Sequence, residues 1–158
     1  MLERLEKVRL NEDLPSYLEA LEGLSQNLIY IVSVRDDAQR IIEPINYQLS
    51  TLGIQTDLTD KYGNSFISVY DVSSGYSYEA FSTEKLEKTI DAGDLPIDIK
   101  VISAGNQAGN TASIRIGGRE YAKNKRGLNI VIYDKTLGKV FDSFYVDTNA
   151  DETFTIIR

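Results

Sequence analysis

Two short polar segments of the sequence hold the residues best placed to bind a ligand. In Val34-Arg35-Asp36-Asp37-Ala38, two adjacent carboxylates end a predicted central strand and precede a predicted helix. Ligands of α/β folds often bind at this carboxyl-terminal edge of a strand. The second segment, Arg126-Gly127-Leu128-Asn129, enters a strand after a basic turn. The candidate ligand-binding residues are therefore Asp36, Asp37, Arg126 and Asn129.

Each segment also has a purely structural interpretation. A carboxylate at the start of a helix accepts hydrogen bonds from the free N–H groups and is stabilised by the helix dipole, so Asp36 or Asp37 suits an N-cap. Two adjacent carboxylates nevertheless leave one of them free for another role. Arg126 and Gly127 alone are equally typical of a glycine turn with a solvated arginine.

The residue types exclude much familiar chemistry. The chain has neither cysteine nor histidine, which removes thiolate nucleophiles, the usual general base and the usual zinc ligands. The carboxylate pairs Asp57/Asp60 and Asp91/Asp94 fall in polar loop stretches and lack the spacing of a calcium loop. We therefore predict no catalytic residue, no metal site and no cofactor.

The charge and hydropathy also restrict the possible partners. The net charge of −7 argues against nucleic acid, because Lys123, Lys125 and Arg126 form too short a basic cluster to follow a phosphate backbone. No apolar stretch approaches the ~20 residues of a membrane span, and residues 1–4 lack the pattern of a signal peptide. We expect no membrane insertion, and the location of the protein stays open. The Gly/Asn-rich residues 103–113 resemble a loop between strands more than a phosphate cradle.

The 158 residues, of which 42% are hydrophobic, suit a single ordered domain, with a split near residues 91–96 as the alternative. The first half is predicted to be rich in helix. Its expected elements are a short amphipathic helix in the first ten residues, a second helix capped by Asp13, a doubly covered strand over Leu28–Val34, and a helix over residues 38–52 interrupted by Pro44 and ended by Gly53.

The second half is predicted to be rich in strand. Residues 66–72 and 76–81 are expected to pair as a hairpin, and Ser82 to open a short helix with Leu86 and Ile90. Further expected strands cover residues 97–102, 112–116, 119–121, 128–133, 139–146 and 154–157, with a Gly117-Gly118 turn before the third. The fold class is therefore α+β.

Several of these segments together resemble the interleukin-like EMT inducer domain, also called the GG domain. Its first half is similar to IKVISAG…GNTASIRIGG…YAKNKRGLNIVIYDKTLGKVFDSFYVDT in residues 97–158. Its second half is similar to LPSYLEAL, IYIVSVRDDA, LSTLGI and SFISVYD in residues 1–90. The halves stand in reverse order, which resembles a circular permutation; two half-domains that swap between molecules are the alternative. A permuted chain should bring residues 147–158 close to residues 1–14.

The resemblance implies two β-sheets packed as a sandwich with flanking helices. It also implies sugar binding without catalysis, through an Arg and an Asp whose motifs match Arg126 and Asp36. The third sugar contact of the family is an arginine, and its position corresponds to Gly63 in this chain. Lys61 or Asn64 could make this contact instead. An arginine and an aspartate offer donors and acceptors to vicinal hydroxyls, and a tyrosine ring covers a sugar face. Asp36 and Arg126 could equally form a structural ion pair.

The leading hypothesis is a non-catalytic, carbohydrate-binding module of bacterial surface-polysaccharide or phage host-recognition machinery. Its partner would be a glycan or another protein. The absence of cysteine fits a bacterial or phage member of the family better than a disulfide-bonded cytokine. The alternatives are a structural connector of the tail-fibre or tandem-repeat kind and, third, a carboxylate-based glycan-active enzyme.

Overall fold

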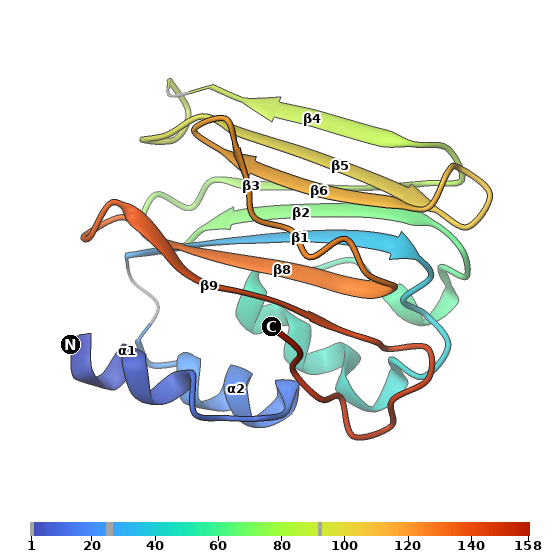
Figure 1. Ribbon diagram of the computed structural model, residues 1–158, viewed down its shortest axis with the longest axis horizontal. Helices are drawn as coiled ribbons and strands as arrows, with labels where there is room; N and C mark the ends of the chain where they lie inside the picture. Colours follow the sequence, from blue (N-terminus) through green and yellow to red (C-terminus); the bar gives the residue numbers. More distant parts are fainter. Residues whose placement is uncertain (1, 25–26, 92) are drawn as a thin grey trace.

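The computed structural model describes residues 2–24, 27–91 and 93–158, and it shows an α+β protein built on a nine-stranded sheet (Figure 1). The strands are β1 (Leu28–Asp36), β2 (Ser65–Asp71), β3 (Ser77–Ser82), β4 (Leu86–Ile90), β5 (Ile99–Gly105), β6 (Thr111–Ile116), β7 (Arg119–Glu120), β8 (Gly127–Asp134) and β9 (Lys139–Val146). The helices are α1 (Leu2–Val8), α2 (Leu14–Leu21) and the 3-10 helices η1 (Glu43–Leu52) and η2 (Leu58–Asp60). The predicted α+β class is confirmed.

The strands fall into two groups, which are joined through β1. The first strand group has the order β3-β2-β1-β8-β9, and all of its neighbours are antiparallel. The second strand group has the order β4-β5-β6-β7. The groups are joined where the last two residues of β1 pair in parallel with Ala104 and Gly105 of β5. Figure 1 shows the second strand group above the first, and the helices below the first strand group.

The apolar run of β1 is buried on both faces, as predicted. Alternate side chains of a strand point to opposite faces of the sheet. Tyr30, Val32 and Val34 belong to a core shared with the helices, whereas Ile29 and Ile31 belong to a second core shared with the second strand group. β1 is therefore the layer between two cores, which explains why it has no polar face.

Buried serines connect the two strand groups at the end of β1. Ser33 donates a 2.6 Å hydrogen bond to the carbonyl of Ile102 in β5, and Ser103 donates to the carbonyl of Val34. The Ser103 hydroxyl also accepts a 2.9 Å hydrogen bond from the Phe66 N–H in β2. These contacts satisfy polar groups that would otherwise be unpaired inside the protein, so they fix the relative position of the two groups.

The two N-terminal helices form where the sequence predicts them. Asp13 caps α2 by accepting a 2.8 Å hydrogen bond from the Ser16 N–H, and Pro15 lies in the first turn. α2 buries Leu14, Tyr17 and Leu18 against the first strand group. None of the helices in the described part of the chain is long and apolar enough to cross a membrane.

The helix predicted directly after Asp36 and Asp37 is wrong. The chain makes irregular turns after β1, and a 3-10 helix begins only at Glu43, with Pro44 in its first turn. A proline disfavours helical conformation in the preceding residue but suits the first turn of a helix, so it marks a start here and not a kink. Neither aspartate caps this helix. Gly53 ends it with φ 83°, as predicted.

The short helix predicted after Ser82 is also wrong, because Leu86 and Ile90 belong to strand β4, which pairs with β5. Residues four apart share a face of a strand as well as of a helix, so this spacing cannot separate the two. The Tyr70–Ser77 hairpin and the β6–β7 turn match the prediction. In the predicted turn over 91–96, residue 92 lies outside the described residues.

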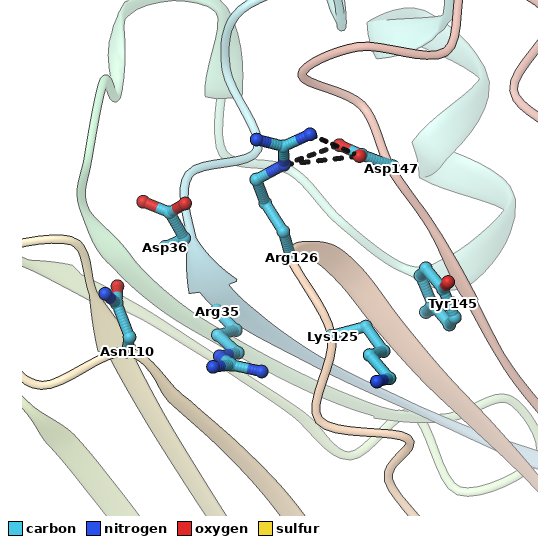
Figure 2. Close-up of a pocket in the computed structure, with 7 residues that line it drawn as sticks. All are labelled: Arg35, Asp36, Asn110, Lys125, Arg126, Tyr145 and Asp147. Carbon is cyan, nitrogen blue, oxygen red and sulfur yellow. Dashed lines mark hydrogen bonds and ion pairs between the residues drawn. The ribbon is translucent and has the colours of Figure 1, made fainter.

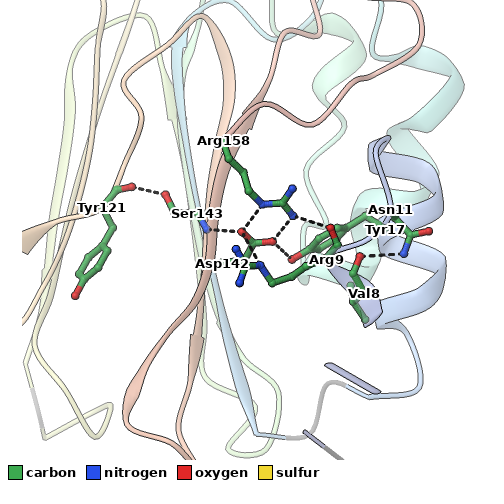
Figure 3. Close-up of polar contacts among 8 residues, drawn as sticks. All are labelled: Val8, Arg9, Asn11, Tyr17, Tyr121, Asp142, Ser143 and Arg158. Carbon is green, nitrogen blue, oxygen red and sulfur yellow. Dashed lines mark hydrogen bonds and ion pairs between the residues drawn. The ribbon is translucent and has the colours of Figure 1, made fainter. Parts of the chain in front are cut away.

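The C-terminal segment runs beside the N-terminal one, as predicted. The Leu14 N–H donates to the carbonyl of Phe154 at 2.9 Å, and the Ile156 N–H donates to that of Glu12 at 2.8 Å. The segment forms only isolated bridges and not the strand predicted over 154–157. Arg158 then reaches the buried Asp142 of β9, which also accepts from Tyr17 of α2 (Figure 3).

Candidate binding site

The register of β1 and β8 brings Asp36 and Arg126 to one place. Arg35 of β1 lies opposite Gly127 of β8 in the antiparallel pairing. Asp36 follows Arg35 and Arg126 precedes Gly127, so the two charged residues lie at the same end of the strand pair. The sheet itself therefore places these two candidates side by side.

The pairing of β8 with β9 adds Asp147 to the same end. Leu128 lies opposite Val146, so Asp147 comes beside Arg126. The Arg126 guanidinium donates to the Asp147 carboxylate from Nε at 3.2 Å and from Nη2 at 2.7 Å. These hydrogen bonds raise the pKa of Arg126. A two-pronged ion pair of this kind fixes the direction of the guanidinium plane.

Gly127 permits the close approach of β8 to β9 at this point. It has φ 100°, and a Cβ atom added there would lie 2.3 Å from the Val146 carbonyl oxygen. Only glycine combines this backbone conformation with this lack of space. The glycine is thus required for Arg126 and Asp147 to meet.

An open pocket of about 390 Å³ lies at the junction of the two strand groups (Figure 2). Its walls come from the end of β1, the β5–β6 loop, the turn before β8, and β9. The lining residues are Arg35, Asp36, Asn110, Lys125, Arg126, Tyr145 and Asp147. Five of these seven side chains are charged, so the pocket suits a polar ligand more than an apolar one.

The Asp36 carboxylate has no hydrogen-bond or ion-pair partner among the residues that the structure describes. Arg126 is paired with Asp147 and not with Asp36. Asp36 is also in the left-handed backbone region, with φ 67°. Residues other than glycine seldom adopt this conformation, and strain of this kind is frequent at ligand sites. Asp36 is therefore a pre-positioned acceptor at the edge of the pocket.

Two further hydrogen bonds fix the wall formed by residues 122–126. Arg35 donates from Nη1 to the carbonyl of Asn124, whose own side chain accepts a 2.9 Å hydrogen bond from the Ala112 N–H. Asn124 has φ 58°, a conformation that asparagine tolerates better than most residues. The turn is thus attached to β1 and to β6, and through them to both strand groups.

Asn129 supports the pocket from behind and does not line it. Its side chain is fully buried, accepts from the Lys125 N–H at 3.0 Å, and donates to the carbonyl of Lys125 at 2.7 Å and to that of Ser33 at 3.3 Å. Both main-chain groups of Lys125 are therefore held by one amide. Asn129 positions Lys125 in the wall of the pocket.

Asp37 points away from the pocket into the protein. It is 5% exposed, and its carboxylate accepts hydrogen bonds from the N–H groups of Gln39 at 3.0 Å and Gly63 at 2.9 Å. Both N–H groups donate to the same oxygen, Oδ1, so this oxygen serves the local backbone. The structure assigns Asp37 the task of attaching the loop around Gly63 to the end of β1.

Several lining residues were not predicted as ligand-binding residues, although some lie within segments named above. Arg35 stands in the first polar segment, Lys125 in the basic cluster, and Asp147 near the end of the run YAKNKRGLNIVIYDKTLGKVFDSFYVDT. Asn110 lies in the Gly/Asn-rich residues 103–113, which we interpreted as a loop, and no local pattern marks Tyr145 as a binding residue. Gly63, Lys61 and Asn64 do not line the pocket, and Lys61 instead pairs with Asp60 and lies over the ring of Phe81.

The fold and the site define an α+β protein with an open, charged pocket built on rigid strand ends. In the described part of the chain no three Asp or Glu side chains converge as metal ligands. Compared with family models, curated proteins and solved structures, the chain matches none.

Proposed function

We propose that this chain is a non-catalytic carbohydrate-binding module and that its ligand occupies the pocket between Asp36 and Arg126. The observation that supports this most is the Asp36 carboxylate, which is held in a strained conformation without a partner, beside an arginine oriented by Asp147. A ligand with hydroxyl groups would supply the missing donors.

The shape and lining of the pocket fit a saccharide better than a compact apolar molecule. Asp36 accepts hydrogen bonds, Asn110 both donates and accepts them, and Tyr145 adds an aromatic ring with a polar end. An open pocket also leaves room for a chain of sugars to continue beyond the bound residue. These properties suit recognition of a glycan without its cleavage.

The arrangement of the strands and of the chain ends supports the same proposal. The second core, between the two strand groups, supports a sandwich of two sheets joined through β1. The contact of residues 154–156 with residues 12–14 supports a circularly permuted relative of the interleukin-like EMT inducer domain. Together with the sugar site, this favours a role beside bacterial surface-polysaccharide or phage host-recognition machinery.

A glycan array combined with NMR titration tests the proposal. Asp36→Asn and Arg126→Gln should each lose binding while the protein stays folded. Asparagine is chosen because it tolerates the positive φ of Asp36, which alanine does not. Glu19→Gln and Arg40→Gln are the matched controls, since both residues are exposed and lie outside the pocket. If no glycan shifts the resonances of the pocket residues, the carbohydrate-binding proposal is wrong.

A structural connector is the second candidate, supported by a different surface. Two neighbouring hollows share Glu6 and Arg9 and include the exposed side chains of Leu10 and Leu137. Exposed leucines beside hollows are typical of protein contacts. A defined oligomer in light scattering that disappears in Leu10→Ser, without any response to glycans, would favour this function instead.

A further inference from the structure

The side chains that line the pocket carry one more positive than negative charge. Arg126 and Asp147 neutralise one another through their ion pair. Two cations, Arg35 and Lys125, then remain with the single carboxylate of Asp36. Within the described part of the chain, the Lys125 ammonium has no hydrogen-bond or ion-pair partner. A positive pocket is unexpected in a chain of net charge −7, so the excess needs an explanation.

Hydrogen bonds fix the guanidinium of Arg35 and the main chain of Lys125. The Arg35 guanidinium is oriented by the Asn124 carbonyl, which uses one Nη1 donor and leaves its other donors without a described partner. Lys125 has its main chain fixed on both sides by Asn129. Figure 2 shows the charged ends of Arg35 and Lys125 turned to the same side and the Asp36 carboxylate turned the opposite way, on the side of the Arg126 guanidinium. Two cations that line one pocket favour an anionic group in the ligand.

We infer that the sugar bound in this pocket carries a carboxylate, as a uronic acid does. Its carboxylate lies between Arg35 and Lys125, and its ring hydroxyls donate to Asp36. Arginine and lysine both form strong charge-assisted hydrogen bonds with carboxylates, and the planar fork of arginine fits one with two parallel bonds. This inference rests on the proposed carbohydrate-binding function and narrows its ligand to acidic glycans.

Asp36 sets the limit on how anionic the ligand can be. A ligand with negative charge on every unit, such as a nucleic acid, would bring charge against this unpaired carboxylate and against the acidic protein as a whole. A neutral sugar would satisfy Asp36 but leave both cations unpaired. A saccharide with one carboxylate beside several hydroxyls satisfies both sides of the pocket.

The test compares two sugars that differ only in the carboxylate. Methyl glucuronide and methyl glucoside are titrated into the intact chain and followed by NMR, with sodium acetate as a probe that has the carboxylate but no sugar. One charge-assisted interaction should make glucuronide binding about tenfold tighter than glucoside binding. Acetate should bind more weakly than glucuronide, because it has no hydroxyls for Asp36.

Variants assign the preference to the two cations. Lys125→Gln should reduce the preference for glucuronide over glucoside at least threefold, since it removes one of the two cations that line the pocket. Arg35→Gln should also reduce this preference, and because it loses the hydrogen bond to the Asn124 carbonyl as well, each variant is compared by the ratio of its two affinities. Lys123→Gln is the matched control, because Lys123 is an exposed lysine of the same turn that does not line the pocket. It should keep the full preference.

The outcomes separate this inference from the function on which it rests. Equal binding of the two sugars at the pocket would overturn the acidic ligand and leave the carbohydrate-binding function intact. Acetate binding as tightly as glucuronide would also overturn it, because the site would then be a general anion site. The absence of binding by either sugar and by every member of a glycan array would reject the function itself. A preference that survives Lys125→Gln and Arg35→Gln would refute the assignment to these residues.

Discussion

Replacement of Asp142 by asparagine should destabilise the protein more than any other isosteric change of a carboxylate in it. The Asp142 side chain is 1% exposed. It accepts hydrogen bonds from the Tyr17 hydroxyl at 2.8 Å, and from Arg158 at 2.8 Å through Nε and at 2.7 Å through Nη2 (Figure 3). The Ser143 N–H adds a further bond at 2.9 Å. One carboxylate thus joins α2, β9 and the C-terminal residue.

The expected loss follows from these contacts. Removal of one partner of a buried ion pair costs about 3–5 kcal/mol, because the other charge is left unpaired. Here the loss is smaller, since the Arg158 side chain is 33% exposed and can turn to water. Asparagine also keeps one acceptor oxygen but turns an NH₂ group toward one of the donors. We expect the free energy of unfolding to fall by about 2–3 kcal/mol, which is about 5–10 °C in Tm.

The effect should depend on pH in a defined direction. Burial raises the pKa of Asp142, but the hydrogen bonds from Arg158 and Tyr17 outweigh it and hold the pKa below its ordinary value. A carboxylate with a lowered folded-state pKa contributes stability above its unfolded-state pKa of about 3.9 and loses it as the pH falls through the folded-state pKa. The difference between wild type and Asp142→Asn should therefore be full at pH 7 and shrink below about pH 4.

Urea unfolding at pH 7 and at steps down to pH 2.5 measures this difference. The variant comparison is needed because Asp151, which accepts from Thr153, also has its pKa lowered, to about 2. Asp91→Asn, at an exposed position, is the control. A double-mutant cycle with Tyr17→Phe should give a coupling of about 1–2 kcal/mol. Equal stabilities of wild type and Asp142→Asn at pH 7 would refute the reasoning.

Three further substitutions test the construction of the pocket. Gly127→Ala should lower the free energy of unfolding by more than about 2 kcal/mol, measured in urea, because its Cβ would lie 2.3 Å from the Val146 carbonyl oxygen. Asn129→Ala should cost about 2 kcal/mol and raise hydrogen exchange at the Lys125 amide, since that amide loses its acceptor. Asp36→Gly should raise stability by about 0.5–1 kcal/mol in thermal melts while glycan binding is lost, because glycine accepts φ 67° without strain. Stability unchanged or lowered in Asp36→Gly would show that this position is not strained.

The sequence predicts the strands well where a single local pattern determines them. β1 was predictable because a run of apolar and β-branched residues without a polar face has to be covered on both sides. The β2–β3 hairpin follows from its turn residues. The helix predicted from Leu86 and Ile90 is wrong because their spacing fits a helix and a strand equally. Only the pairing of β4 with β5 decides between the two structures.

The candidate site was predictable only in part. Asp36 and Arg126 stand in recognisable segments, and the structure brings both to one pocket. Asp37 and Asn129 stand in the same segments but serve the backbone, a difference that depends on which way each side chain turns. Asn110 and Tyr145 belong to the β5–β6 and β8–β9 hairpins, which meet at the pocket only because β1 pairs with both β5 and β8. No local pattern contains that information.

The position of the pocket explains why its residues are so scattered. The end of β1 is the one place in the described structure where strands of the two groups pair through their backbones, at Ala104 and Gly105. A ligand in the pocket touches Asp36 from the first group and Asn110 from the loop of the second, so it bridges the same junction. Binding free energy would therefore add to the stability of that junction, since a ligand that binds only the folded state stabilises it. The strain at Asp36 is tolerated because buried hydrogen bonds from Ser33 and Ser103 already hold the strands on either side of it.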